Sequence, residues 1–416
     1  MRVLLFAGAG TSIELGVPGM VGLGEEFVDH AQQWNVEPDL VKSLIGHQLD
    51  VEHLIESLDR ICTARPTLKA IGQGSVSLDR ADKIRAEVEW FVQHAAERVL
   101  ASDARIVWGP VLRAASAANL TITTTNYDRA IELAANAESV SLDDGFETRS
   151  NGETFAWAGF DQDGDRPILV KLHGSTDWYA TDEHGIPTKL THPMPLFGRA
   201  RLRLSDGTEL GSALVLPSRE KLLTHSPYPR LSQTFLNAAD SCDMAIFVGS
   251  SLRDHHVRDA AESTARRVPL VVVNPDGESF GLEGVRVIAE CASTFLISTL
   301  PYVLTSDNPV NTIESVQAQP DRDAGILDPV RQALDADAPV EARCRALERL
   351  DESEVRLDLH FLRQLLNDRS ATVARYALGL ISLSSNHLQL VEEAATGPHA
   401  NDPAFRQDLQ MLRDIL

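Results

Sequence analysis

The sequence predicts an α/β fold, in which a doubly wound, mostly parallel, Rossmann-like sheet carries a helical insertion and is followed by an all-α domain. Two observations predict it. Apolar runs typical of buried strands recur between loops and amphipathic helices, at residues 3–7, 120–125, 168–174, 212–217, 244–251, 270–276 and 285–290. The first run leads into a glycine-rich turn at residues 8–12, the arrangement with which nucleotide-binding βα units begin.

Length and charge limit the class of protein. With 416 residues, of which 43% are hydrophobic, the chain can form two or three domains with buried cores. Its 60 acidic and 38 basic residues give a net charge of -22, so we expect no direct binding to nucleic acid. No apolar run approaches the length of a membrane span and no export signal follows Met1, so we expect a cytoplasmic protein without membrane contact.

The cysteines and histidines do not predict a metal site. Four cysteines are scattered without a C-x-x-C pair, at Cys62, Cys242, Cys291 and Cys344, which predicts free thiols. His255 and His256 follow Asp254, but adjacent residues of a helix point in different directions. We therefore expect no bound metal.

The pattern divides the chain into three parts. Residues 1–305 are expected to form the catalytic domain, with a helical insertion at about 24–105, where apolar residues recur three and four positions apart. Residues 306–325 are polar and interrupted by prolines, as in a linker. Residues 326–416 are expected to be helical. Arg343, Arg375 and Arg406 recur there at 31 to 32 residues, which favours short HEAT-like repeats over an ordinary helical bundle.

Polar or turn-forming residues follow the apolar runs, namely Gly8, Asn126, His173, Pro217, Gly249 and Asn274. Because the carboxyl ends of parallel strands meet at one edge of a sheet, these residues are expected to line one ligand crevice.

The first turn has the features of a phosphate site. Gly8 and Gly10 let the backbone approach a ligand, and Thr11 and Ser12 suit a helix N-terminus, whose N–H groups and dipole attract phosphate. However, Ile13 stands where G-x-G-x-x-G has its third glycine. An ordinary hydride-transferring dehydrogenase is therefore disfavoured.

The other strand ends offer groups for binding and catalysis. Gly249 is followed by Ser250 and Ser251, which suit phosphate or ribose hydroxyls. Asn126 and Asp128 precede a predicted helix, so helix capping is an equal alternative to ligand binding. His173 stands next to a glycine at a strand end; a structural role is its alternative. Asn274 offers an amide, or forms a turn before Pro275.

Five segments, GAGTSIELGVP, TTNYD, KLHGS, FVGSSL and VVVNPD, resemble in order and spacing the NAD-binding fold of sirtuins, over roughly residues 1–300. The closer resemblance is to bacterial sirtuin-like NAD hydrolases, which commonly serve in anti-phage defence. It implies a pyrophosphate turn, a nicotinamide-ribose site, a catalytic base and an adenosine site. The pyrophosphate turn would be formed by Gly8, Ala9, Gly10, Thr11 and Ser12. The nicotinamide-ribose site would contain Asn126 and Asp128, and the catalytic base would be His173. The adenosine site would contain Gly249, Ser250, Ser251 and Asn274.

The chain departs from deacylating sirtuins at two places. Their four-cysteine zinc module follows the His-Gly motif, whereas residues 175–241 here contain no cysteine. Gly19, Met20 and Val21 stand where deacylases have an aromatic residue and an arginine. The resemblance therefore implies NAD cleavage rather than deacylation, with NAD as substrate, no zinc and no other cofactor.

The chemistry of NAD agrees with this reading. Nicotinamide leaves as a neutral molecule and an oxocarbenium-like ribosyl centre develops, so one base and one orienting amide suffice. We expect an NAD glycohydrolase that forms nicotinamide and ADP-ribose, or a cyclised product. The alternatives are an NAD- or ADP-ribose-binding scaffold without turnover and an enzyme that transfers ADP-ribosyl or acyl groups.

Such an activity would deplete the cell of NAD and so needs control. We expect a homo-oligomer, with the C-terminal helices as the contact surface. The resemblance implies a partner such as a HerA-type ATPase, an Argonaute-like protein or a STAND protein.

Overall fold

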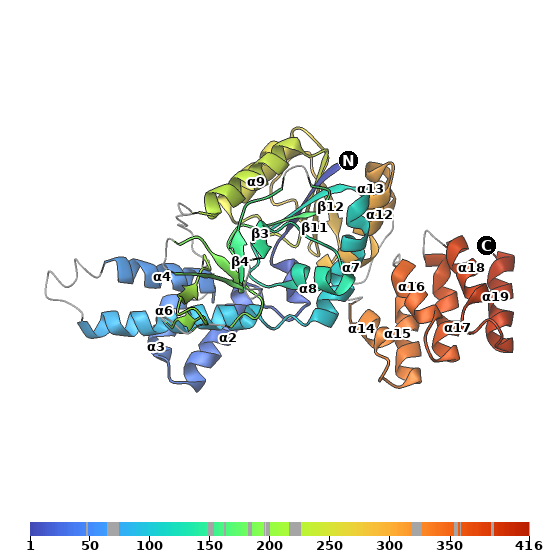
Figure 1. The fold of residues 1–416 in the computed structure, drawn as a ribbon, viewed down its shortest axis with the longest axis horizontal. Coiled ribbons are helices and arrows are strands. Elements are labelled where there is room, and N and C mark those ends of the chain that lie inside the picture. The colour runs from blue at the N-terminus through green and yellow to red at the C-terminus, as the bar shows by residue number, and fades with distance from the viewer. Residues whose placement is uncertain are drawn as a thin grey trace.

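The computed structural model describes residues 1–46, 49–64, 75–148, 154–161, 164–181, 185–194, 196, 200–215, 226–317, 327–352, 357, 359–383 and 387–415. Its centre is a six-stranded parallel sheet with the strand order β12-β11-β10-β1-β2-β5 (Figure 1). The strands are β1 (Arg2–Ala7), β2 (Asn119–Thr124), β5 (Ile168–Lys171), β10 (Met244–Val248), β11 (Leu270–Asn274) and β12 (Arg286–Ala289). The predicted parallel sheet is thus confirmed.

Alternate residues of β1 enter two different cores, because successive side chains of a strand point to opposite faces. Val3 and Leu5 pack in one core with helices α7 (Ala101–Ala114), α8 (Ala130–Glu138), α11 (Ala292–Ser298) and α12 (Leu300–Thr305). Leu4 and Phe6 pack in the other with α9 (Tyr228–Ser241) and α10 (His255–Ala265). The sheet is therefore buried on both faces, which explains its nearly continuous apolar strands.

The helical insertion has a core of its own. It consists of α2 (Met20–Gln33), α3 (Pro38–Ile45), α4 (Val51–Thr63) and α6 (Ser75–Ala96), which lie to one side of the sheet (Figure 1). The carboxylate of Asp50 caps α4 by accepting a hydrogen bond from the Glu52 N–H at 2.9 Å. Helix α7 begins inside the range expected for the insertion, but Trp108 on it is buried in the core of the parallel sheet.

A second, antiparallel sheet was not predicted. Its order is β3-β4-β7-β6-β9-β8, with β3 (Phe146–Thr148), β4 (Thr154–Trp157), β7 (Thr188–Leu190), β6 (Trp178–Ala180), β9 (Glu209–Ser212) and β8 (Leu202–Arg203). The run at 212–217 was predicted as a strand of the parallel sheet, which is wrong, because Ser212 ends antiparallel β9. Pro217 lies outside the described residues. These strands of two to four residues are too short to show a period in the sequence.

The C-terminal helices continue the core of the parallel sheet. They are α13 (Pro309–Gln317), α14 (Leu327–Leu334), α15 (Val340–Glu352), α16 (Leu359–Leu366), α17 (Ala371–Gly379), η2 (Leu380–Leu383), α18 (His387–Thr396) and α19 (Pro403–Ile415). Buried residues from Ala333 to Leu409 belong to the same hydrophobic cluster as Val3 and Trp108. Helix α13 occupies part of the expected linker.

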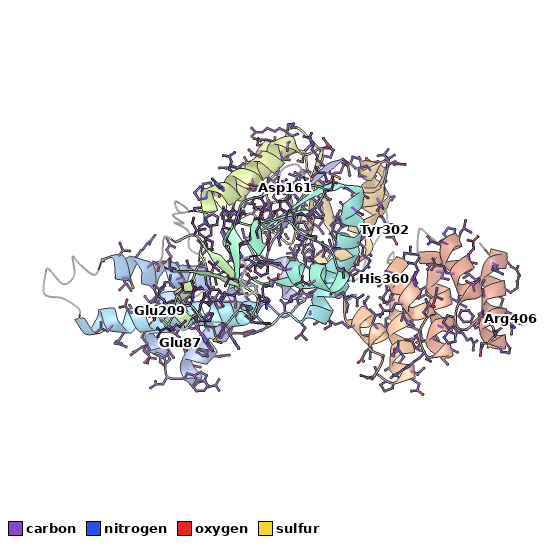
Figure 2. All side chains as sticks on the ribbon, viewed as in Figure 1. Glu87, Asp161, Glu209, Tyr302, His360 and Arg406 are labelled. Carbon is purple, nitrogen blue, oxygen red and sulfur yellow. The ribbon has the colours of Figure 1, made fainter. Side chains whose placement is uncertain are left out.

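Hydrogen bonds from two side chains fix these helices to the rest of the chain. Tyr302 is labelled in Figure 2. Its hydroxyl donates to the Leu357 carbonyl at 2.5 Å. The Arg331 guanidinium donates to Asp103 at 2.8 Å and to the Glu14 carbonyl at 3.1 Å. A side chain of the C-terminal helices therefore reaches the residue that follows α1 (Gly10–Ile13).

The recurrent arginines have different environments. Arg343 is 2% exposed and donates to both oxygens of Asp368, at 3.2 and 2.6 Å. Arg375, by contrast, is exposed and pairs with Asp408 at 2.6 Å, while exposed Arg406 donates to the Ala400 carbonyl at 3.3 Å. The HEAT-like repeat stays a prediction. In the part of the chain that the structure describes, no helix is long and apolar enough to cross a membrane.

Candidate functional site

The centre of the parallel sheet is a topological switch point. From β1 the chain continues to β2 and β5 on one side of the sheet, and later to β10, β11 and β12 on the other. In open α/β sheets, ligands bind outside the carboxyl ends of the strands at such a point. The loops at residues 8–12 and 249–254 adjoin it.

The two glycine turns of these loops pack backbone against backbone. The Gly8 N–H donates to the Val248 carbonyl at 2.9 Å, and the Gly10 N–H donates to the Gly249 carbonyl at 2.8 Å. A Cβ atom on Gly8 would lie 2.5 Å from the Gly249 oxygen, and Gly249 itself has a φ of +61°. Glycine is therefore needed here for the packing of the two turns, whether or not a ligand is bound.

The helix expected after the first turn is present as a single turn, α1. Its first N–H groups have partners within the turn. The Thr11 N–H donates to the Gly8 carbonyl and the Ser12 N–H to the Ala9 carbonyl, each at 3.0 Å. Ala9 is exposed. Contact of this turn with a pyrophosphate stays a prediction.

The Asn126 side chain joins the loop after β2 to the first turn. Its Nδ2 lies 2.9 Å from the Gly8 carbonyl, 2.9 Å from the Ser12 hydroxyl and 3.1 Å from the Thr11 hydroxyl. The Ser12 hydroxyl in turn donates to Asp128 Oδ2 at 2.7 Å. The structure thus brings together five residues that the sequence predicted for the site.

Asp128 joins the start of α8 to the first turn. Its Oδ1 accepts a hydrogen bond at 3.0 Å from the N–H of Ala130, the first residue of α8, while its Oδ2 bonds Ser12. Asp128 is 5% exposed, whereas Asn126 is half-buried. Of the two, Asn126 is the more accessible to a ligand.

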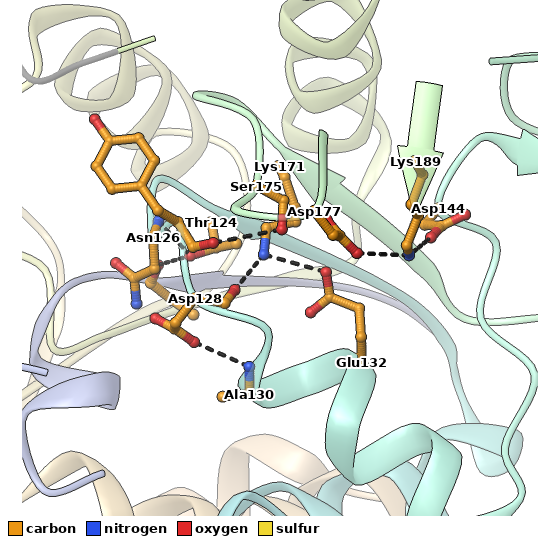
Figure 3. Close-up of polar contacts among 12 residues, drawn as sticks. Thr124, Asn126, Asp128, Ala130, Glu132, Asp144, Lys171, Ser175, Asp177 and Lys189 are labelled. Carbon is orange, nitrogen blue, oxygen red and sulfur yellow. Dashed lines mark hydrogen bonds and ion pairs between the residues drawn. The ribbon is translucent and has the colours of Figure 1, made fainter. Parts of the chain in front are cut away.

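A buried charged network contacts this loop (Figure 3). Lys171, the last residue of β5, is 2% exposed; its ammonium donates to the Asp128 carbonyl and lies 3.1 Å from Glu132 Oε1. Burial raises the pKa of Glu132, although the charge of Lys171 opposes this effect. The Lys171 side chain therefore fixes the backbone beside Asn126.

The network extends to the antiparallel sheet. Lys189 on β7 pairs with Asp144 and lies 3.6 Å from Asp177 (Figure 3). Burial opposes the charge of Lys189, but the carboxylates of Asp177 and Asp144 outweigh it and raise its pKa.

His173 is 5% exposed and follows β5. Its Nε2 lies 3.5 Å from Asp254 Oδ2, in the loop after β10. Strands β5 and β10 are separated by β1 and β2, so three spacings of about 4.8 Å place them about 14 Å apart. The two loops therefore contact one another across the carboxyl ends of β1 and β2, the strands that Gly8 and Asn126 follow.

Tyr127 connects this site to the helical insertion. Its ring packs in the core of the insertion, and its centroid lies 6.3 Å from that of His173. Its hydroxyl donates to the Val215 carbonyl at 2.7 Å. Burial, followed by the charge of Glu52, raises the pKa of Tyr127 well above its ordinary value, so its hydroxyl is neutral.

The remaining predicted residues lie at the ends of β10 and β11. The Ser250 hydroxyl accepts from the Leu252 N–H at 3.2 Å, and Ser251 is exposed. The Asn274 side chain donates to the Glu278 carbonyl at 2.7 Å and accepts from the Glu278 N–H at 3.0 Å. Asn274 thus forms the turn that the sequence offered as its alternative role. Its contact with a ligand stays a prediction.

Sequence reasoning missed four residues that shape the site. Tyr127, Glu132, Lys171 and Asp254 contact the loops of Asn126 or His173. A lysine at the end of an apolar strand, two residues before the histidine of the His-Gly pair, was a usable signal for Lys171. His255 and His256 are exposed at the start of α10, and no group of three or more potential metal ligands occurs among the described residues.

Comparison with known proteins adds one firm result. Residues 120–275 match the family model described as SIR2-like domain, a range that includes Asn126, His173, Gly249 and Asn274 but not the first turn. No curated protein matches this chain.

Solved structures with a similar chain path are Sir2 homologues. One in complex with NAD is 14% identical, covering 76% of this chain and 90% of its own, with a TM-score of 0.41. A mutant Sir2 homologue with 2'-O-acetyl ADP ribose is 13% identical, covering 76% and 94%, also with a TM-score of 0.41. A Sir2–p53 peptide–NAD+ structure is 13% identical, covering 71% and 90%, with a TM-score of 0.34. Residues 120–275 are therefore similar in sequence to the family described as SIR2-like domain.

Proposed function

We propose that this protein is an NAD glycohydrolase, which cleaves the bond between nicotinamide and ribose and releases ADP-ribose or a cyclised form of it. The observation that carries this proposal is the contact of two loops across the carboxyl edge of the sheet. Asn126 bonds the first turn there, and His173 meets the loop of β10 above the same strands. The SIR2-like domain includes both residues.

The chemistry assigns a role to each side chain. As the C–N bond breaks, nicotinamide takes the electron pair and leaves neutral, and positive charge develops at the ribose. His173 accepts a proton from the attacking water or ribose hydroxyl. Asn126 orients that hydroxyl or water, and Asp128 stabilises the positive charge. The turns at Gly8–Ser12 and Gly249–Ser251 hold the pyrophosphate and adenosine portions.

The cellular role in this proposal is that of a cytoplasmic anti-phage effector. A partner such as a HerA-type ATPase, an Argonaute-like protein or a STAND protein activates it, and residues 326–416 provide the assembly surface of a homo-oligomer. The contact of Arg331 with the Glu14 carbonyl supports a link between these helices and the first turn. The oligomer is tested by particle mass measured on the full chain, because truncation would expose the shared core.

The test is product analysis of NAD incubated with the full-length protein and extracts of phage-infected or uninfected bacteria. We expect nicotinamide and ADP-ribose by mass spectrometry in at least one mixture. Asn126→Ala and His173→Gln should each slow nicotinamide release by about 10²-fold or more. His255→Ala, which changes an exposed histidine near the same loop, is the matched control and should keep the parent rate.

Other outcomes identify the alternatives. NAD that stays bound and intact in all mixtures would replace the proposal with a binding scaffold. ADP-ribose or acyl groups on protein, in place of free ADP-ribose, would replace it with a transferase. If Asn126→Ala and His173→Gln released nicotinamide as fast as the parent, the assignment of the site would be wrong.

A further inference from the structure

Asp254 presents its two carboxylate oxygens to two different elements. Oδ1 caps α10, since it accepts from the N–H groups of His256 and Val257 at 3.0 and 3.5 Å. Oδ2 lies 3.5 Å from Nε2 of His173, which belongs to the loop after β5. Capping alone would require only one of these oxygens. The second is directed at the histidine that the proposed reaction uses as its base.

The backbone of the loop after β10 has an unusual conformation just before Asp254. Leu252 has a φ of +51°, a backbone conformation that bulky residues rarely adopt, and its side chain is 2% exposed in the core beneath α9 and α10. Gly249, at φ +61°, begins the same loop. A buried anchor thus maintains an unfavourable backbone conformation, and the loop turns toward β5 directly after it.

Arg253, which precedes Asp254 in the chain, and Tyr127, whose ring lies beside that of His173, have contacts of their own. Arg253 is directed at Asp50, 3.4 Å away. Tyr127, whose ring centroid lies 6.3 Å from that of His173, has a raised pKa and stays neutral; Glu52 and Arg85 are the charged groups that act on it. On α10 itself, His255 and His256 are exposed. The carboxylate that faces the imidazole from the loop after β10 is that of Asp254.

We propose that Asp254 is the positioning residue of His173, which holds the imidazole ring and stabilises its protonated form during the reaction. The inference rests on the proposed function for its catalytic meaning. A carboxylate beside Nε2 favours the tautomer with the proton on that nitrogen, which leaves the Nδ1 lone pair to accept a proton. When the attacking hydroxyl bonds to the ribose carbon and gives up its proton, His173 becomes an imidazolium paired with Asp254.

The test measures the pKa of His173 directly, by NMR titration of the full-length protein labelled with ¹³C at the histidine rings. His173→Gln identifies the resonance. Because an opposite charge within 4–6 Å favours the charged form, Asp254→Asn should lower the pKa of His173 by about 1, a tenfold change in proton affinity. Asparagine is also a good N-cap, so α10 should be retained. Asp259→Asn, which removes an exposed charge from the same helix, should leave the pKa unchanged.

Activity provides a second readout. The acidic limb of the pH profile for NAD cleavage should move to lower pH in Asp254→Asn, with a lower maximal rate and little change in KM. If the pKa of His173 were the same in the parent and in Asp254→Asn, the positioning role would be refuted even with an active enzyme. If the pKa fell as expected but no variant and no parent protein cleaved NAD, the pair would stand and the proposed function would fail.

Discussion

The turns at residues 8–12 and 249–254 have the same pattern in sequence, a glycine after a buried strand followed by short hydroxyl side chains, but they make different contacts. In the first turn, Ser12 and Thr11 bond the side chain of Asn126 from the neighbouring loop. In the second turn, backbone fills the space against Gly10, and Asp254 extends over the sheet to His173. The first turn therefore contacts the loop of Asn126, whereas the second contacts the loop of His173.

The largest loss of stability is expected from breaking the buried Lys171–Glu132 pair, which lies beside the loop of Asn126. Lys171→Met leaves Glu132 buried without its partner, so we expect the free energy of unfolding to fall by about 3–5 kcal/mol. Urea denaturation measures this change. Adding Glu132→Gln should restore part of the loss, because the unpaired charge is then gone.

Lys83→Met is the matched control, since Lys83 is exposed on α6. It should change the stability by less than about 0.5 kcal/mol. A Lys171→Met protein as stable as the parent would show that the buried network does not support the loop.

A smaller loss of stability is expected when a substitution disturbs the backbone packing of the second turn, at residues 249–254. In Gly249→Ala the new Cβ would lie 2.7 Å from the Gly10 Cα, and φ is +61°. We expect a loss of about 2–3 kcal/mol in thermal unfolding. Gly379→Ala, in helix α17 with no atom within 4 Å of the added Cβ, should be neutral or slightly stabilising. Equal stability of the two variants would mean that the turns can separate without cost.

The smallest change in stability is expected from substituting Asn274, which the sequence predicted as a ligand contact. Both ends of its side chain are bonded to Glu278, so Asn274→Ala should cost about 1 kcal/mol of stability. We expect KM for NAD to change less than about threefold, which corresponds to under about 0.7 kcal/mol. A tenfold or larger rise in KM at unchanged stability would instead place Asn274 in the binding site.

Sequence patterns predicted the parallel sheet because its strands are buried on both faces and therefore read as continuous apolar runs. The same patterns predicted Asn126, Ser12 and His173 at one edge of the sheet, because the carboxyl ends of parallel strands lie at the same edge. The antiparallel sheet was missed, because strands such as Leu202–Arg203 are too short for a period. Others, such as Thr154–Trp157, pair with a strand more than 30 residues further along the chain. Asp254 was missed for a different reason. Its pairing with His173 depends on a loop that crosses two strands, which no local pattern encodes.

The most direct test of the account is a crystal structure of His173→Gln with NAD. This variant keeps the hydrogen bonds between Asn126 and the first turn, and it leaves NAD uncleaved if His173 is the base. We predict the nicotinamide ribose between Asn126 and residue 173, with the pyrophosphate beside Gly8–Ser12. NAD bound away from the carboxyl ends of β1, β2 and β10, or with its nicotinamide ribose remote from residue 173, would contradict the account.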